Sequence, residues 1–215
     1  GLLASMVKKF EGGDVVTLFL NGAFGDVNHI DVANPWQLSG AAEALRIAGI
    51  LAGEVFKTIR KSRAVKLVPL EAARSRLKLP VRKPSREAVE AAREALARGG
   101  LSVREEVYAR ELLALSRMGD YVDAEIQALR LGELVLIGLP GEPFCEHGLR
   151  LKAVSPFNYT MVVGLANGYL GYIPTVKAFQ EGGYEVRLAR HTKLAPEAVV
   201  KMMTEAEKLL GQLGS

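Results

Sequence analysis

The pattern of apolar and polar positions along the chain predicts helices that alternate with strands. Apolar residues recur every three to four positions in residues 2–10 and again in residues 39–61, which is typical of amphipathic helices. Between these segments, residues 14–22 form a short apolar run rich in β-branched and aromatic side chains. We therefore expect a buried strand there, followed by a loop and a long helix.

The middle of the chain predicts an edge strand followed by two charged helices. Residues 64–81 alternate in part between apolar and polar positions, which indicates one or two strands. Pro69 favours a sheet edge, because proline cannot donate to a strand ladder. Ser85 is suited to cap one helix, and a second helix is expected over residues 102–118. We expect the charges of both helices to face solvent.

The last third of the chain predicts the centre of the sheet. Residues 121–139 have the pattern of a β-hairpin with its turn at Gly132-Glu133, and the second arm is apolar throughout, which favours a central position. A short helix is expected over residues 144–154 and a buried strand over residues 159–165. The final helix is expected to begin near Pro196, since proline is favoured in a first helical turn.

These elements predict an α/β fold in a single domain over residues 1–215. The expected architecture is a mixed sheet flanked by helices, with a helical excursion near residues 84–118. The chain carries 28 Lys and Arg against 24 Asp and Glu, a net charge of +4, and this mild excess does not indicate a nucleic-acid partner. No apolar run reaches the ~18 residues of a membrane span, so no transmembrane segment is expected.

Compartment and oligomeric state are left open by the sequence. The first nine residues lack the charged-then-apolar order of a signal peptide. The single cysteine, Cys145, excludes an internal disulfide and is compatible with either side of a membrane.

Candidate chemistry gathers in three loops that each follow a predicted strand. They carry Gly25, Asp26 and Asn28 in the first loop, Glu142 in the second and Tyr172 in the third. Ligands of open α/β sheets collect at the carboxyl ends of strands, so the three loops would meet if their strands are parallel neighbours. Gly-Asp and Asn-Gly are also ordinary turn sequences, which is the structural alternative. Glu142 favours function more strongly, because it lies between a glycine and a proline at a strand end.

The remaining polar and aromatic candidates have structural alternatives of their own. Tyr169, Tyr172 and Tyr184 could form an aromatic cluster. The three histidines show no metal-ligand spacing, and His147 has the position of a structural histidine within a helix. Cys145 lies beside an acidic residue, which disfavours a reactive thiolate.

Three motifs, in order along the chain, resemble the neutral/alkaline ceramidase family. The first is residues 19–28, which resemble that family's active-site loop. The second is the strand and loop of residues 134–144, followed by residues 148–151. The third is residues 166–175 with the later residues 183–185, where the family pattern is roughly Asn-x-Tyr-x-Gly-Tyr-(Val/Ile)-x-Thr and a second Tyr-Glu twelve residues on.

The resemblance implies a zinc-dependent amidase that cleaves the fatty-acid amide of ceramide, so the expected cofactor is zinc and the expected partner is a small-molecule amide or lipid substrate. Members of that family hold the metal with two histidines, a Glu and a Tyr. By analogy Glu142 and Tyr172 are the expected metal ligands. Tyr184 is expected to act near the substrate carbonyl, and Gly25 and Asp26 in the active-site loop are the expected substrate-binding residues.

Two positions depart from the family pattern. Asn28 occupies the catalytic position of the family's active-site serine, and an amide side chain cannot act as a hydroxyl nucleophile or acid/base group. The two histidine ligands of the family come from a region before the active-site loop, and none of the histidines here matches them. The chain is therefore expected to be the C-terminal portion of a larger ceramidase-like catalytic domain.

Two functions remain open at this point. The first is a zinc-dependent amide hydrolase that resembles neutral ceramidase and acts on ceramide or on another amide or ester. The alternative is a catalytically inactive homologue or fragment that binds a lipid-like or other small ligand. The Asn28 substitution favours this alternative, whereas the joint presence of Glu142, Tyr172 and Tyr184 favours the hydrolase. A phosphate-binding loop near Gly22 is discounted, because the P-loop lysine is absent there.

Overall fold

The computed structural model describes residues 1–214, which form two compact units. The first unit comprises residues 1–20 and 28–66, and the second comprises residues 21–27 and the chain from residue 67 onward.

The first unit is built from two amphipathic helices, α1 (Leu2–Glu11) and α2 (Gly40–Lys61), as their periodicity predicts. Their apolar faces pack together, and the rings of Phe10 and Phe56 lie 4.5 Å apart between centroids. An ion pair of 3.0 Å joins Arg60 of α2 to Glu11 of α1. Apolar packing and this pair therefore hold the two helices side by side.

The strand predicted over residues 14–22 is wrong, because no residue of that run belongs to a strand. The run is largely exposed, with Val16 at 82% and Leu18 at 83% of full exposure. An apolar sequence can favour an extended backbone, but a strand also needs a neighbouring strand that takes up its N–H and C=O groups. Sequence pattern alone does not provide that neighbour.

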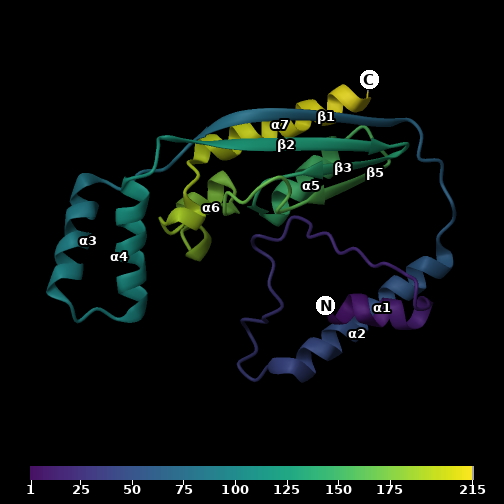
Figure 1. The fold of residues 1–215 in the computed structure, drawn as a ribbon, viewed down its shortest axis with the longest axis horizontal. Coiled ribbons are helices and arrows are strands. Elements are labelled where there is room, and N and C mark those ends of the chain that lie inside the picture. The colour runs from purple at the N-terminus through teal and green to yellow at the C-terminus, as the bar shows by residue number, and fades with distance from the viewer. Residues whose placement is uncertain (215) are drawn as a thin grey trace. The chain divides into compact units, whose positions relative to one another are not determined.

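The second unit contains a four-stranded mixed sheet, which confirms the predicted α/β class. Its strands are β1 (Leu70–Pro80), β2 (Tyr121–Leu131), β3 (Leu134–Gly138) and β5 (Tyr159–Val163), in the order β1-β2-β3-β5 (Figure 1). The β1–β2 and β2–β3 pairs are antiparallel, whereas β3 and β5 are parallel. The predicted edge strand and central hairpin arm are thus confirmed as β1 and β3.

The burial predicted for the strand of residues 159–165 is largely wrong. β5 forms the other edge of the sheet, and Val162 is its one buried residue. Tyr159 and Met161 point away from the core and are exposed. An apolar run is buried on both faces only where layers cover both, and the edge position of β5 removes part of that cover.

Two helices cover one face of the sheet and complete the core. α7 (Pro196–Gly214) packs against β1, β2 and β3, and α5 (Cys145–Val154) lies beside α7. The Arg150–Glu207 ion pair, at 2.5 Å, joins these helices at the surface. The largest fully buried side chains include Leu79, Ile126, Val135, Ile137, Met202 and Leu210, which come from both layers. Their alternation along β1 and β2 places charged side chains on the opposite face of these two strands.

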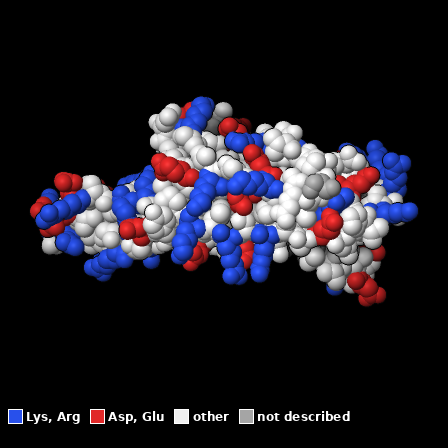
Figure 2. All heavy atoms as spheres, turned by 90° about the horizontal axis from the view of Figure 1, so that it is seen from above, with Lys and Arg blue, Asp and Glu red and all other residues white. Residues whose placement is uncertain are grey.

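The polar face of β1 and β2 is organised by cross-strand ion pairs. Arg76 lies opposite Glu125 at 3.0 Å, and Lys78 lies opposite Asp123 at 3.5 Å. Figure 2 likewise shows Lys and Arg side chains interspersed with acidic ones on the face that it presents. The basic side chains at Arg76 and Lys78 are therefore paired with acidic side chains across these two strands.

The predicted helical excursion is confirmed as a helical hairpin of α3 (Arg86–Arg98) and α4 (Val103–Ser116), which leaves the sheet between β1 and β2 (Figure 1). The Ser85 hydroxyl accepts a hydrogen bond of 3.2 Å from the Ala88 amide and so caps α3 as expected. Ser102 and Glu105 form a capping box at the start of α4. Local sequence signals therefore define both helix starts. No helix within residues 1–214 is long and apolar enough to cross a membrane.

We expect Ile137→Ala to lower the free energy of unfolding by about 3 kcal/mol, because truncating this fully buried side chain of the central strand leaves a cavity in the core. Urea unfolding followed by circular dichroism measures the change. The matched control is Leu149→Ala on the exposed side of α5, for which we expect a change of about 0.5 kcal/mol or less. Equal losses in the two variants would contradict this placement of the core.

Candidate functional site

The site begins where the parallel strands β3 and β5 end. These strands are paired from Leu134 opposite Tyr159 to Gly138 opposite Val163, so both chains leave the sheet at the same edge. The Leu139 amide donates to the Val163 carbonyl at 2.8 Å, and the Ala166 amide donates to the Leu139 carbonyl at 3.0 Å. The second and third predicted loops therefore start as neighbours, as their position after parallel strands requires.

A two-stranded parallel sheet continues this pairing and brings Glu142 beside Tyr172. Its strands are β4 (Glu142–Pro143) and β6 (Tyr172–Ile173), with Glu142 directly opposite Tyr172. The Glu142 amide donates to the Gly171 carbonyl at 2.9 Å, and the Phe144 amide donates to the Ile173 carbonyl at 3.1 Å. The two residues predicted as metal ligands are thus neighbours in this small sheet.

Close backbone approach brings the first predicted loop, which carries Gly25, next to Glu142. The Gly25 amide donates to the Pro143 carbonyl at 2.8 Å, and a Cβ at Gly25 would overlap the carbonyl oxygen of Glu142. A Cβ at Gly141 would likewise overlap the carbonyl oxygen of Gly171. Glycine at these positions therefore allows three chain segments to pack around Glu142.

Asp26 lies at the same place but has a partner of its own. Its Oδ1 accepts a hydrogen bond of 2.6 Å from the Cys145 amide, which is the first residue of α5. Phe144, the residue that precedes α5, provides no side-chain cap. Asp26 therefore caps α5 from a distant segment and ties the first loop to the helix that follows Glu142. Its predicted role in binding substrate stays a prediction.

Tyr169 contacts Glu142 directly, a role that the sequence analysis did not assign. Its hydroxyl donates to Glu142 Oε1 at 2.8 Å. Partial burial and this bond to a carboxylate raise the pKa of Tyr169 to about 12, so the phenol keeps its proton. Tyr169 thus orients one Glu142 oxygen. The signal in the sequence was its place in the same short motif as Tyr172.

Three aromatic rings form the other side of the site. The Tyr172 and Tyr184 rings meet edge to face with centroids 5.8 Å apart, and His191 stacks on Tyr184 at 5.5 Å. Burial, followed by the charge of Glu142, raises the pKa of Tyr172 to about 12. Tyr184 keeps about half of its surface exposed. The predicted carbonyl-binding phenol therefore lies next to the predicted metal ligand and remains accessible.

His191 is a second member of the site that sequence reasoning missed. It lies in a 3-10 turn, η2 (Arg190–Thr192), and no motif spacing connects it to Tyr172 or Glu142. Its Nε2 is shielded from solvent and has no hydrogen-bond partner among residues 1–214. A Cβ at Gly171 would overlap the His191 carbonyl, so close backbone packing places the histidine beside the site. That contact was not readable from either segment alone.

His147 and Asn28 each have a hydrogen-bond partner of their own. His147 is buried within α5, and its Nε2 lies 3.2 Å from the Pro174 carbonyl oxygen, which confirms its structural interpretation. Asn28 belongs to the first unit, where it is exposed and its Oδ1 accepts a hydrogen bond of 3.3 Å from the Ile30 amide. The other predicted site residues all belong to the second unit. The match of Asn28 to the family's catalytic position stays a prediction.

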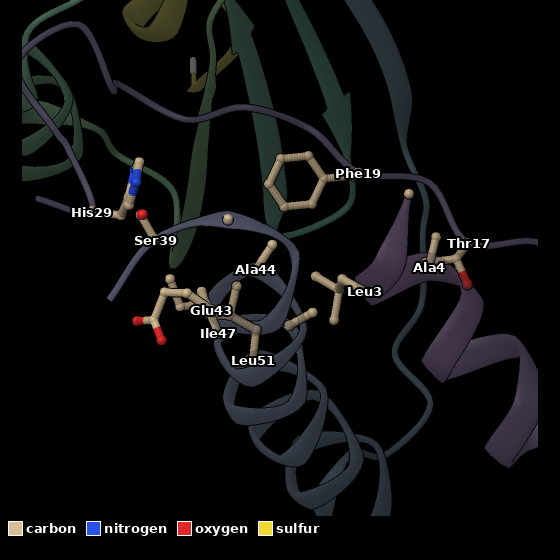
Figure 3. A pocket seen from close by; sticks show the side chains of 13 residues that line it. Leu3, Ala4, Thr17, Phe19, His29, Ser39, Glu43, Ala44, Ile47 and Leu51 are labelled. Atoms are coloured by element: carbon tan, nitrogen blue, oxygen red, sulfur yellow. The ribbon is translucent and has the colours of Figure 1, made fainter. Parts of the chain in front are cut away.

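The first unit contains a cavity of about 490 Å³ of its own (Figure 3). Leu3, Phe19 and Leu51 contribute to a lining that is largely apolar, and His29 and Glu43 lie at one end. The Glu43 carboxylate is already bonded to Arg46 of the same helix, at 2.6 and 2.8 Å. None of the predicted catalytic, substrate-binding or metal-binding residues lines this cavity.

Comparison with known proteins places this geometry in context. Over 66 residues the chain is 36% identical to the neutral ceramidase of Mycobacterium tuberculosis, a stretch that covers 28% of this chain and 10% of that protein. Its fold is similar to the crystal structure of neutral ceramidase from Pseudomonas aeruginosa, with a TM-score of 0.67 and 16% identity. That match covers all of this chain and 40% of the other. These findings support a ceramidase-like relationship.

A second solved structure, a ceramidase complexed with C2, has a TM-score of 0.54 and 14% identity over 80% of this chain and 34% of its own. No protein-family model matches the chain. The chain spans 40% and 34% of these two ceramidase chains, so it is less than half as long as either. At 16% and 14% identity, the structural likeness shows a shared fold only.

The stability of the second unit should depend on pH through His147. Burial lowers the pKa of His147 below the ordinary 6.5, so below that pH the unfolded chain binds a proton that the folded chain binds less readily. We therefore expect the contribution of His147 to stability to be present above pH 6.5 and to be lost as pH falls through its lowered pKa.

Urea unfolding at pH 7 and pH 5 tests this expectation. His147→Gln should show a shallower loss of stability between these pH values than the wild type, since its amide can still donate to Pro174 but does not titrate. His29→Gln, which replaces an exposed histidine of the first unit, should retain the wild-type slope. A wild-type slope in His147→Gln would overturn the assignment.

Proposed function

We propose that this chain forms part of a zinc-dependent amide hydrolase of the neutral ceramidase kind. The observation that carries the proposal is the side-by-side placement of Glu142 and Tyr172 in β4 and β6, with the Tyr184 ring in contact with Tyr172. The three residues come from separate segments, and their proximity supports the roles proposed for them. The ceramidase-like relationship supports the same activity.

The donor atoms of the site suit zinc in part. Zinc accepts carboxylate oxygens, and Glu142 offers one oxygen besides the one that receives the Tyr169 hydroxyl. Tyr172 would contribute its phenol oxygen, and a bound cation would counter the raised pKa that burial and Glu142 impose on this group. When bound, zinc supplies Lewis-acid polarisation of the amide carbonyl.

Glu142 and Tyr172 do not complete a zinc site. Catalytic zinc normally has three protein ligands, and no group of three or more His, Cys, Asp and Glu side chains in residues 1–214 is placed to hold a metal ion. We infer that the remaining ligands are histidines from polypeptide outside these 215 residues. The match to 40% of the Pseudomonas ceramidase is consistent with a catalytic domain larger than this chain.

Each of the chain's own site residues would then have a separate role at the substrate amide. Tyr184 lies beside Tyr172 and is about half exposed, so its hydroxyl can donate a hydrogen bond to the carbonyl oxygen as negative charge develops there. The Tyr172 and His191 rings restrict the position of the Tyr184 ring. Tyr169 fixes the Glu142 carboxylate through its 2.8 Å hydrogen bond. Gly25 and Asp26 would form the wall of the substrate site next to Glu142.

The substrate is proposed to be a fatty-acyl amide such as ceramide, with another amide or ester as the wider class. Asn28 stands where the related family has its active-site serine, so this position supplies no hydroxyl. Asn28 also favours a second candidate function, a non-catalytic relative that binds a lipid-like ligand without cleaving it. The two functions differ in one observable property, which is turnover.

Zinc binding should depend on Glu142. We expect Glu142→Gln to weaken zinc affinity by at least about tenfold, because a neutral amide replaces the one carboxylate among the proposed ligands. Equilibrium dialysis of the protein as its gene encodes it, which would include the proposed histidine ligands, with elemental analysis measures zinc per chain. Glu146→Gln, four residues on and exposed on α5, is the control and should match the wild type. Equal zinc content in the wild type and Glu142→Gln would refute the metal assignment.

Turnover should depend on the Tyr184 hydroxyl. In the protein as its gene encodes it, we expect Tyr184→Phe to lower the rate of hydrolysis of a fluorogenic fatty-acyl amide about 100-fold, with zinc content unchanged. Phenylalanine keeps the ring contacts and removes the donor. Tyr159→Phe, which alters an exposed tyrosine of β5, should retain the wild-type rate. Binding of the amide without hydrolysis by the wild type would instead establish the second candidate function.

A further inference from the structure

The segment that carries Tyr184 and His191 has little regular structure to hold it in place. Residues 183–193, here called the Tyr184 loop, contain two three-residue 3-10 turns, η1 (Tyr184–Val186) and η2. Turns of this length have few hydrogen bonds of their own. The positions of the two site rings therefore depend on side chains that reach the Tyr184 loop from other elements.

The helical hairpin provides the most extensive of these contacts. Glu111 of α4 accepts a hydrogen bond of 3.0 Å from the Arg190 backbone amide. Its carboxylate also pairs with the Arg190 guanidinium, at 3.0 Å from Nε and 2.7 Å from Nη2. The bond to Arg190 lowers the pKa of Glu111, so the carboxylate stays ionised. One acidic side chain thus holds both the backbone and the side chain of the residue before His191.

A second residue of α4 contacts the same loop one turn earlier. The guanidinium of Arg187 lies over the ring of Tyr108, 3.4 Å from its centroid. Tyr108 and Glu111 are three positions apart and therefore share one face of α4. That face contacts the Tyr184 loop at two points, and the loop turns its Tyr184 and His191 rings toward Tyr172.

The sheet side holds the same loop through backbone carbonyls. Arg82 donates to the carbonyls of Val186 and Thr192, at 2.7 and 2.9 Å. The buried ammonium of Lys193 donates to the carbonyls of Leu170 and Arg190, at 2.7 and 3.0 Å, and so joins the loop to the segment that leads into Tyr172. Glu111 and Tyr108 extend this support to the helical hairpin.

We propose that Glu111 is a positioning residue for Tyr184, and that the α3–α4 hairpin supports the site rather than serving as a solvated excursion. Glu111 fixes the Arg190 backbone, Arg190 sets the place of His191, and the His191 ring stacks on Tyr184. The catalytic consequence of this inference rests on the proposed hydrolase. The positioning itself is measurable without turnover.

Hydrogen exchange of the Tyr184 loop tests the positioning directly. We expect Glu111→Ala to speed amide exchange in residues 184–193 by about tenfold or more, because it releases the Arg190 amide and side chain. Glu111→Gln should show a smaller increase, since its amide oxygen can still accept from the Arg190 backbone. Glu106→Gln is the matched control, as Glu106 also pairs with an arginine of α4, Arg110, but does not contact the loop. Equal exchange in Glu111→Ala and Glu106→Gln overturns the proposal.

Measuring kcat tests whether the positioning by Glu111 affects catalysis. In the protein as its gene encodes it, Glu111→Gln should lower kcat for the fatty-acyl amide about tenfold with zinc content unchanged. The Glu111→Arg, Arg190→Glu double variant should be faster than Glu111→Arg alone because it restores the ion pair, but slower than the wild type because an arginine at position 111 cannot accept from the backbone amide of residue 190. Faster exchange with wild-type kcat overturns the positioning role. If the wild type shows no hydrolysis, the proposed function fails and the exchange result alone decides the role of Glu111.

Discussion

The parallel pairing of β3 with β5 is the constraint on which the rest of the site depends. Because both strands run the same way, their chains leave the sheet at one edge, and the pairing resumes as β4 and β6. Glu142 and Tyr172 become neighbours through this second ladder. Antiparallel neighbours would have sent the two loops to opposite ends of the sheet. Strand direction therefore decides which side chains can act together at the site, before any side-chain contact is considered.

Glycine lets the backbone segments around this edge approach one another closely. Side chains at Gly25, Gly141 or Gly171 would overlap carbonyl oxygens of neighbouring segments, so each glycine allows one more segment into the site. Gly171 also has a φ of 87°, a conformation that other residues rarely adopt. Three polar groups around the site have defined partners: Asp26 caps α5, Tyr169 holds Glu142, and buried Lys193 joins the segments of Tyr172 and His191. A bound cation would enter a site whose carboxylate is already oriented.

The helical hairpin shows how an element can be predicted correctly while its role is missed. Ser85 and the pair Ser102 and Glu105 are local capping signals, and both helices begin where these residues predict. The same sequence suggested that the charges of the hairpin face solvent. Glu106 does so, whereas Glu111 is largely shielded and binds Arg190 79 residues away. Nothing in the sequence near either residue distinguishes these two glutamates, because the difference lies in what packs against α4.

The sequence by itself determined the α/β class, the helices at both ends of the chain, the β-hairpin with β3 at the centre, and the motifs that named Glu142, Tyr172 and Tyr184. Those features depend on periodicity, capping and turn residues, which act over a few positions. Only the tertiary structure decided that residues 14–22 form no strand, that β5 lies at an edge, and that Tyr169 and His191 belong to the site. Strand pairing, burial and ring contacts involve residues far apart in the chain. Their energies come from the partner, and a local sequence does not specify which partner it will meet.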